Sequence, residues 1–196
     1  MDAAPDAIEA RLAARLRALR ADRGLTLEGL AERSGVSRSM ISLVERGESS
    51  PTASVLNRLA MGLGVALADL FDEAERPDAS PLSRRAGQGS WRDPETGYVR
   101  RNLSPPGYPS PIELVEVLFP AGARVFYENA PRAAGIAQQV WVLEGTIEMT
   151  AGEETYLLEA GDCLAMRLDR PTGFRNPTDR PARYLVALAA DPEHRR

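Results

Sequence analysis

Three polar residues lie at helical spacing after a glycine, and their side chains suit contact with the edges of DNA bases. Arg38, Ser39 and Ser42 follow Gly35 closely. An arginine guanidinium can donate to both O6 and N7 of guanine, and a serine hydroxyl can pair with several base edges. The apolar residues of the same stretch take the other helical positions, so packing does not explain these three side chains. The pattern predicts a surface that reads DNA sequence.

Two short helices folded around Gly35 would position this surface. Thr26 is a good N-cap for a helix that runs to about Ser34. Gly35 suits the tight turn, because glycine takes left-handed backbone angles without a steric penalty. Ser37 can cap the second helix, and Gly47 ends it. Two helices crossed at such a turn present the N-terminal half of the second one to the major groove.

Three further helices are expected around this pair. Apolar residues at helical spacing predict a first helix over about residues 7–21. A fourth helix is expected to start at Thr52 or Ser54 and to pass through Leu63. A short fifth helix is expected from Leu67 to about Asp72. The prediction for residues 8–74 is therefore a five-helix bundle.

The stretch from about Ile8 to Asp72 resembles the Xre, or lambda-repressor-like, helix-turn-helix family. The matching segments are residues 30–37, 41–42, 44–47, 51–52, 59–60 and 63–65. The family often has Gln, used on the phosphate backbone, where this chain has Leu27. The DNA-binding residues that we predict are Thr26, Ser37, Arg38, Ser39, Ser42, Arg46 and Thr52. A structural bundle without DNA binding is the alternative, and Glu45 is expected to be an ion-pair partner within the bundle.

The charge of the chain fits this reading once the charges are placed. The net charge is −4, but residues 8–48 contain eight arginines and six acids, a local excess of +2. Local field matters more for DNA binding than total charge. All 24 basic residues are arginine, so a repressor that cleaves itself with a Ser-Lys pair is excluded. We find neither a signal-peptide core nor a membrane-spanning apolar run, and expect a cytoplasmic protein without membrane partners.

Cys163 is the only cysteine of the 196 residues. A single cysteine excludes an intramolecular disulfide framework and a thiolate metal cluster. It could be a reactive sensor thiol, but we expect a buried structural cysteine.

The periodicity changes after a segment without pattern at residues 75–90, which reads as a linker. Residues 91–190 alternate apolar and polar positions in short runs separated by glycine turns. We expect strands at residues 112–119, 139–143, 146–149, 155–158 and 184–188. Such spacing favours a small antiparallel barrel or sandwich. The whole chain is thus predicted to be an α + β protein of two domains.

The second half, about Ile112 to Ala189, resembles the cupin family. The segments responsible are residues 120–123, 141–145, 153–156, 160–162, 171 and 173–176. Cupins commonly bind a metal through three histidines and a glutamate, and those places fall here at Glu128, Ala130, Gln138 and Thr172. The usual ligands are missing, and the sole histidine, His194, lies in a charged tail. The prediction is a cupin-type antiparallel β-barrel with no metal, no cofactor and no catalytic residue.

What remains is an apolar pocket with a few polar groups, as small-molecule sites usually are. Alternation that turns Gln138 inward also turns Val140 and Val142 inward, with Leu164 and Met166 on a facing strand. Asn129 and Arg132 are expected near the mouth. The ligand-binding residues that we predict are Tyr127, Glu128, Gln138, Val140, Val142, Met166 and Thr172. The alternative is a filled barrel that only dimerises.

Together these features predict a transcription regulator. It would bind double-stranded DNA at a roughly palindromic operator as a homodimer, and sense an unknown small-molecule effector through the metal-free cupin domain. One alternative is an antitoxin-like autoregulator that binds a protein partner. Another is a cupin enzyme fused to a DNA reader, which would need a catalytic group that the sequence does not show.

Overall fold

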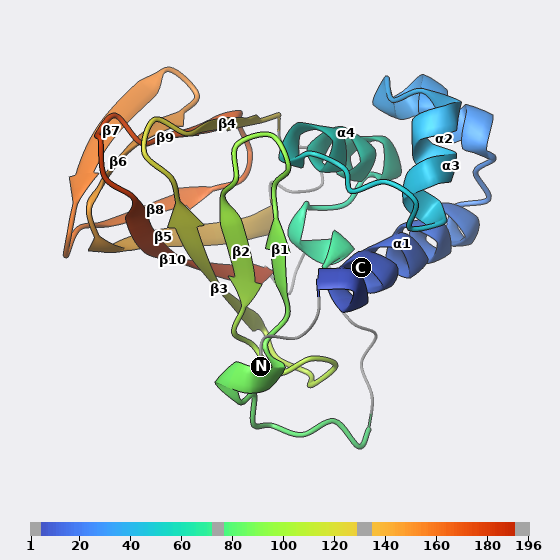
Figure 1. Ribbon diagram of the computed structural model, residues 1–196, viewed down its shortest axis with the longest axis horizontal. Helices are drawn as coiled ribbons and strands as arrows, with labels where there is room; N and C mark the ends of the chain where they lie inside the picture. Colours follow the sequence, from blue (N-terminus) through green and yellow to red (C-terminus); the bar gives the residue numbers. More distant parts are fainter. Residues whose placement is uncertain (1–4, 72–76, 129–134, 191–196) are drawn as a thin grey trace.

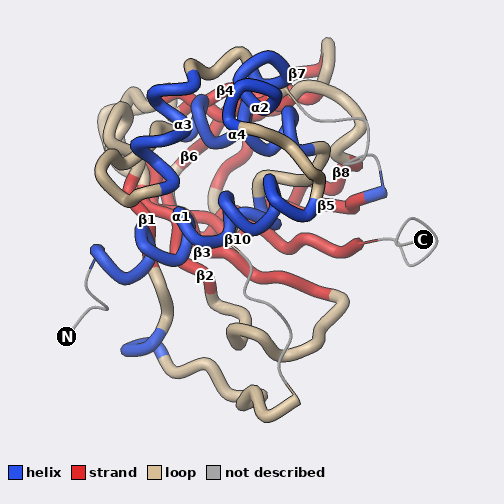
Figure 2. Tube along the Cα trace, turned by 90° about the vertical axis from the view of Figure 1, so that its right-hand side faces the viewer, coloured by secondary structure: helices blue, strands red, loops and turns tan. Residues whose placement is uncertain are grey.

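The computed structural model describes residues 5–71, 77–128 and 135–190. The helices of the N-terminal part are α1 (Pro5–Asp22), α2 (Leu27–Ser34), α3 (Arg38–Glu45) and α4 (Ala53–Leu63). They gather at one end of the molecule, and α4 lies between the α2–α3 pair and the β-sheets (Figure 1). In Figure 2 the helices face the viewer, and the strands extend behind them.

The predicted caps form the helix-turn-helix pair. The Thr26 hydroxyl accepts a hydrogen bond from the Gly29 N–H at 3.0 Å, and α2 ends at Gly35 with a φ of +65°. The Ser37 hydroxyl accepts from the Met40 N–H at 3.3 Å at the start of α3. Each cap satisfies a main-chain donor of the first helical turn that has no partner within its helix. The pair is thus fixed by local sequence, as expected.

The predicted fifth α-helix is wrong. The described residues contain four α-helices, and a single 3-10 turn, η1 (Ala68–Leu70), follows them. The Asp69 carboxylate accepts a hydrogen bond from the Ala66 N–H at 2.8 Å. Such side-chain bonds to the main chain compete with helix formation and favour turns. Asp72, where the predicted helix ended, lies outside the described residues.

The C-terminal part consists of two antiparallel sheets. The six-stranded sheet has the order β1 (Ser90–Arg92), β2 (Val99–Asn102), β3 (Ile112–Phe119), β10 (Ala182–Ala190), β5 (Ile136–Glu144) and β8 (Cys163–Arg167). The four-stranded sheet has the order β4 (Arg124–Tyr127), β9 (Thr172–Arg175), β6 (Thr146–Ala151) and β7 (Glu154–Glu159). The strand predictions are confirmed where they were made. The inward side chains of both sheets form the core, which includes Val115, Val140, Val142, Ile147 and Met149.

The two sheets do not close into the predicted barrel. The chain passes from one sheet to the other at tight corners, which interrupt the hydrogen-bond ladder. At Gly145, between β5 and β6, φ is +78°, and an added Cβ would lie 2.9 Å from the carbonyl oxygen of Pro181. At Gly122, between β3 and β4, φ is +69°. These corners give a double-sheet arrangement of the jelly-roll kind.

The helical part and the sheets share one continuous apolar core. The rings of Phe71, after η1, and Trp91, on β1, have centroids 5.7 Å apart. Helix α1 contacts β1, and α4 contacts β4. Continuous packing of this kind transmits displacements, because protein interiors have few voids to absorb them.

The structure places Cys163 and residues 77–90 as follows. Cys163 is exposed and not buried, because it begins β8 on the outward side of the alternation. The described part of the predicted linker, residues 77–90, includes the short 3-10 turn η2 (Arg85–Gly87) and the first residue of β1. Near its end, a Cβ added to Gly89 would meet the side chains of Ile8 and Arg11 on α1. This end of the segment therefore packs against the helical part.

Candidate DNA interface and interdomain cavity

The predicted base-reading residues share the outer face of α3. Arg38 and Ser39 are exposed, and Ser42 is half-buried. Among the described residues, Arg38 makes no side-chain hydrogen bond or ion pair, so its guanidinium is available for a base edge. The Ser39 hydroxyl lies 3.2 Å from the Ser37 hydroxyl.

Arg46 is held at the end of the same face. Its Nε and Nη2 each donate to the Glu48 carboxylate at 2.7 Å, and its Nη1 donates to the Ser42 hydroxyl. These hydrogen bonds raise the pKa of Arg46 and lower the pKa of Glu48. Both side chains are exposed, so a DNA phosphate could replace Glu48 as the partner of Arg46.

Glu45 is an internal ion-pair partner, as expected. Arg20 of α1 donates to it through Nε at 2.6 Å and through Nη2 at 2.8 Å. The Glu45 hydrogen bonds raise the pKa of Arg20. Only 6% of the Glu45 side chain is exposed, so the carboxylate is turned inward, away from the exposed face of α3. The bidentate pair fixes α3 on α1.

Thr26 and Thr52 begin helices. The Thr52 hydroxyl accepts from the Val55 N–H at 3.3 Å at the start of α4.

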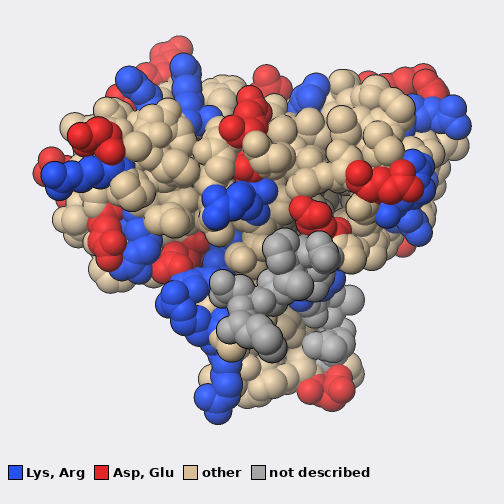
Figure 3. Space-filling model, viewed as in Figure 1, with Lys and Arg blue, Asp and Glu red and all other residues tan. Residues whose placement is uncertain are grey.

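On the face shown in Figure 3, acidic and basic side chains are intermixed over the helical end. This mixture agrees with the small local charge excess of the sequence.

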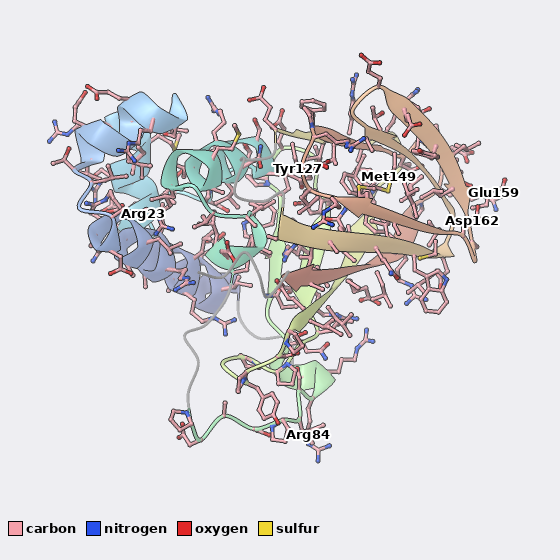
Figure 4. The ribbon with its side chains drawn as sticks, turned by 180° about the vertical axis from the view of Figure 1, so that it is seen from behind. Arg23, Arg84, Tyr127, Met149, Glu159 and Asp162 are labelled. Carbon is pink, nitrogen blue, oxygen red and sulfur yellow. The ribbon has the colours of Figure 1, made fainter. Side chains whose placement is uncertain are left out.

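A cavity of about 80 Å³ lies between the helical part and the sheets. Its helical wall consists of Asn57, Met61, Val65, Ala66, Leu67 and Ala68. Its β wall consists of Tyr98, Arg100, Val117, Tyr127, Gln138, Leu168, Thr172, Phe174, Tyr184, Val186 and Leu188. Figure 4 shows Tyr127 on the side of the sheets that faces α4. The cavity therefore belongs to both parts of the chain.

The structure brings three of the predicted pocket residues together. Tyr127, Gln138 and Thr172 all line the cavity. Val140 and Val142 point inward as expected, but they are fully buried in the core and do not line the cavity.

The remaining predictions fall outside the cavity. The Met166 sulfur accepts from the Gln138 amide at 3.8 Å, behind the lining. Glu128, the residue after β4 ends at Tyr127, is exposed. The structure therefore does not place Glu128 among the lining residues. Asn129, Ala130, Arg132 and His194 lie outside the described residues.

Three tyrosines and one arginine form the polar side of the cavity. The hydroxyls of Tyr98 and Tyr127 are 2.9 Å apart. Burial raises the pKa of Tyr98 to about 12 and the pKa of Tyr127 and Tyr184 well above the usual value, and the nearby charge of Arg100 opposes each shift. All three phenols are thus protonated, and can donate hydrogen bonds, at neutral pH.

Among the described residues, two direct hydrogen bonds connect α4 to the β part. The Asp93 carboxylate, after β1, accepts from the Ala53 N–H at the start of α4 at 2.9 Å. The Asn57 amide of α4 donates to the Glu128 carbonyl oxygen at 3.0 Å. Asp93 is 1% exposed, so its bond is sheltered from water. These bonds and the shared core fix α4 over the cavity.

Comparisons with known proteins agree with this architecture. A family model described as a helix-turn-helix domain matches residues 11–74, and one described as a cupin domain matches residues 117–188. The HTH-type transcriptional regulator SutR of Escherichia coli is 30% identical over 166 residues, which cover 84% of this chain and 86% of the relative. This chain belongs to the HTH-type transcriptional regulators.

Two further relatives have the same layout over most of their length. The HTH-type transcriptional regulator PuuR of Escherichia coli is 28% identical over 181 residues, 88% of this regulator and 91% of PuuR. The crystal structure of an HTH_3 family transcriptional regulator from Vibrio cholerae has a TM-score of 0.69 at 26% identity, with 94% and 98% of the two chains covered. The predicted class of DNA-binding transcription regulator is confirmed, and the antitoxin alternative is not favoured.

The cavity of this regulator does not suit the metal that many cupins bind. Gln138 and Thr172, at two of the usual ligand places, provide an amide and a hydroxyl. Tight binding of a 3d metal needs imidazole, carboxylate or thiolate donors that converge on one point. Among the described residues no three His, Cys, Asp or Glu side chains gather for this purpose.

Within the described part of the chain, no helix is long and apolar enough to cross a membrane.

Sequence reasoning missed Tyr98, Arg100, Tyr184 and Asp93. Tyr98 and Arg100 are two residues apart, so β2 and the residue before it turn both toward the cavity. That alternation was a usable signal. Asp93 had none, because its partner in α4 is forty positions away.

Proposed function

We propose that this regulator binds a roughly palindromic operator as a homodimer, and that a small molecule in the interdomain cavity changes its affinity for DNA. The observation that supports this most directly is the composition of the cavity wall, which comes from α4 and from both sheets. A ligand there contacts the DNA-binding domain itself. A preference of about 1–3 kcal/mol for one arrangement would change operator occupancy substantially.

We assign sequence reading to Arg38, Ser39 and Ser42 on α3. Their exposure and the free guanidinium of Arg38 support this assignment. Arg46 would contact phosphate, and Thr26, Ser37 and Thr52 would hold the helix N-termini at the backbone. In a two-fold symmetric dimer the two α3 helices would lie about 34 Å apart, one turn of DNA.

The outer face of the six-stranded sheet, where exposed apolar side chains surround the ion pairs of Glu116 with Arg101 and Arg183, supports the homodimer. Ile112, Leu114 and Leu118 alternate on β3, and Trp141 on β5 shares their face through Leu185 of β10. Exposed apolar patches of this kind mark interaction surfaces. We assign the face to a second copy of the chain, and native mass spectrometry would give the subunit count.

The proposal includes three further points. The chain is a regulator without catalytic activity, which the names of its relatives support. It acts in the cytoplasm. Residues 8–74 form the DNA-binding domain, 75–90 the connection and 91–190 the cupin domain.

The DNA assignment is tested by binding after selection of an operator from a random DNA library. Arg38→Ala should reduce specific affinity about 5- to 150-fold, because a good bidentate base contact contributes roughly 1–3 kcal/mol, and Ser42→Ala should reduce it by a smaller factor. Arg84→Ala is the control, since Arg84 is exposed and lies far from α3 (Figure 4). Unchanged specific affinity in both α3 variants would show that α3 does not read the operator.

The sensor assignment is tested by native mass spectrometry of the protein as purified from cells. A retained small molecule that changes operator affinity when removed and added back would support it. An empty dimer whose operator affinity responds to no cellular extract would refute it.

A further inference from the structure

We infer that the cavity binds a small, mainly apolar molecule with a hydrogen-bond-acceptor oxygen, and that this molecule acts on DNA binding by lying against α4. The inference rests on the proposed sensor function and names both the chemistry of the ligand and the route of its effect.

The tyrosines and Arg100 give one side of the cavity hydrogen-bond donors without partners among the described residues. The hydrogen bond between the Tyr98 and Tyr127 hydroxyls uses the hydrogen of one of them, so the hydrogen of the other remains available as a donor. The Tyr184 hydroxyl forms no hydrogen bond with any described residue. Arg100 donates through Nη2 to Glu113 at 2.9 Å, and its buried Nε has no partner. Because donors without partners are costly when buried, a ligand that accepts hydrogen bonds would be favoured here.

The charges of the wall do not favour a cationic ligand. Arg100 is the one charged residue among the described lining residues, 8% of it is exposed, and its charge is paired with Glu113. A bound ammonium group would find no carboxylate in the described lining to pair with. A carbonyl oxygen would accept from the phenols without adding a charge, and a carboxylate would also be attracted to Arg100. A carbonyl-type oxygen, neutral or ionised, is therefore the chemistry that fits.

The rest of the wall is apolar and defines the size of the ligand. Met61, Val65 and Leu67 face Phe174, Val186 and Leu188 across the cavity. A volume of about 80 Å³ corresponds to roughly five to eight water molecules, at 10–15 Å³ for each. A ligand with about that number of non-hydrogen atoms would fill it. Such a ligand would have a short branched carbon chain beside its oxygen.

Helix α4 connects the ligand to the DNA-reading pair. Asn57 and Met61 on α4 line the cavity, while Gly62 packs against α2. A Cβ added to Gly62 would lie 2.8 Å from the Ser34 Cβ, so no slack separates the two helices. Ser34 ends α2, and Gly35 leads directly to α3. A ligand that displaces or steadies α4 therefore acts on α2 and α3 as one unit.

Three probes of similar shape test the chemistry: isobutyramide, isobutyrate and isobutylamine. We expect the amide, the acid or both to bind, and the amine not to bind. The comparison of the first two distinguishes a neutral ligand from an ionised one. Binding should slow amide hydrogen exchange at residues 57–68 and change affinity for the selected operator at least fivefold at saturation.

The matched variants are Tyr184→Phe and Tyr156→Phe. Tyr184→Phe removes a hydroxyl without a protein partner, so the fold should persist while probe affinity falls about tenfold. Tyr156 is the control, because its hydroxyl bonds to Glu154 on β7, away from the cavity.

Each outcome decides a different point. If isobutylamine binds and changes operator affinity, the inferred ligand chemistry is wrong, although the sensor function stands. If none of the three probes binds, the ligand chemistry is also wrong, and the retained molecule seen by mass spectrometry decides the sensor function separately. If a probe binds but leaves exchange in α4 and operator affinity unchanged, the route through α4 is refuted.

Discussion

Asp93 provides the sharpest test of how the two domains are joined. Its carboxylate accepts hydrogen bonds from the main-chain N–H groups of Ala53 and Thr96, both at 2.9 Å, and from the Thr96 hydroxyl. Asp93→Ala leaves the buried Ala53 donor without a partner, which costs about 1–3 kcal/mol. The Thr96 donors are half-buried and can reach water, so their loss adds about 1 kcal/mol. We expect a total loss of about 2–4 kcal/mol.

This loss is a large share of the 5–15 kcal/mol that typically stabilises a protein. Asp93→Asn retains one acceptor oxygen and the same shape, so it should lose about half as much. The assay is urea unfolding followed by circular dichroism and by tryptophan fluorescence, in which buried Trp91 should respond more than exposed Trp141, with the exposed Asp78→Ala as control. If Asp93→Ala unfolds at the same urea concentration as Asp78→Ala, the carboxylate does not hold the start of α4, and the interdomain contact described above is wrong.

Three further predictions concern helix packing, pH and charge. Gly62→Ala should destabilise the protein by about 1–2 kcal/mol in urea unfolding, because the clash with α2 exceeds the gain in helix propensity. Gly29→Ala, at a position with room for a Cβ, should stabilise it by about 0.5–1 kcal/mol. Equal effects of the two changes would refute the close approach of α4 to α2. Burial raises the pKa of Tyr98 to about 12, so its phenol contributes about 3 kcal/mol of stability that is complete below pH 10 and is lost as the pH rises through about 12. Tyr98→Phe should therefore flatten the dependence of the unfolding free energy on pH between about 10 and 12. Arg46→Ala removes a proposed phosphate contact and should make the salt dependence of non-specific DNA binding shallower by about one unit in the log–log slope, with the exposed Arg84→Ala as a distant control; an unchanged slope would mean that Arg46 does not reach phosphate.

The helix-turn-helix pair could be predicted from sequence because its signals are local. The caps at Thr26 and Ser37 and the left-handed Gly35 each act within four residues of their own position. The same holds for the alternating strand at residues 112–119, which the structure reproduces at both ends. Short-range hydrogen bonds and side-chain alternation determine such elements before any tertiary contact forms.

The cavity could be predicted only in part because it depends on contacts distant in sequence. Gln138 and Thr172 were placed by family spacing, and both line it. Tyr184 reaches it because β10 lies between β3 and β5, which no local pattern reveals. Glu128 follows the end of β4 at Tyr127, is exposed and is not among the lining residues. The helical wall was unpredictable, because the sequence does not say which face of α4 meets the sheets.

The shared core has a consequence for recombining such regulators. Relatives with a helix-turn-helix domain and a cupin domain look modular, and a chimera would naturally be cut in the segment at residues 75–90. In this protein that cut would separate α4 from the strands that complete its packing, and it would place a foreign helix over the cavity. A working exchange would have to keep α4, η1 and the β wall from the same parent, and a grafted α1 to α3 would have to preserve the contacts of α1 with β1 and of α2 with Gly62. The unit that forms the proposed sensor site is therefore larger than the cupin domain.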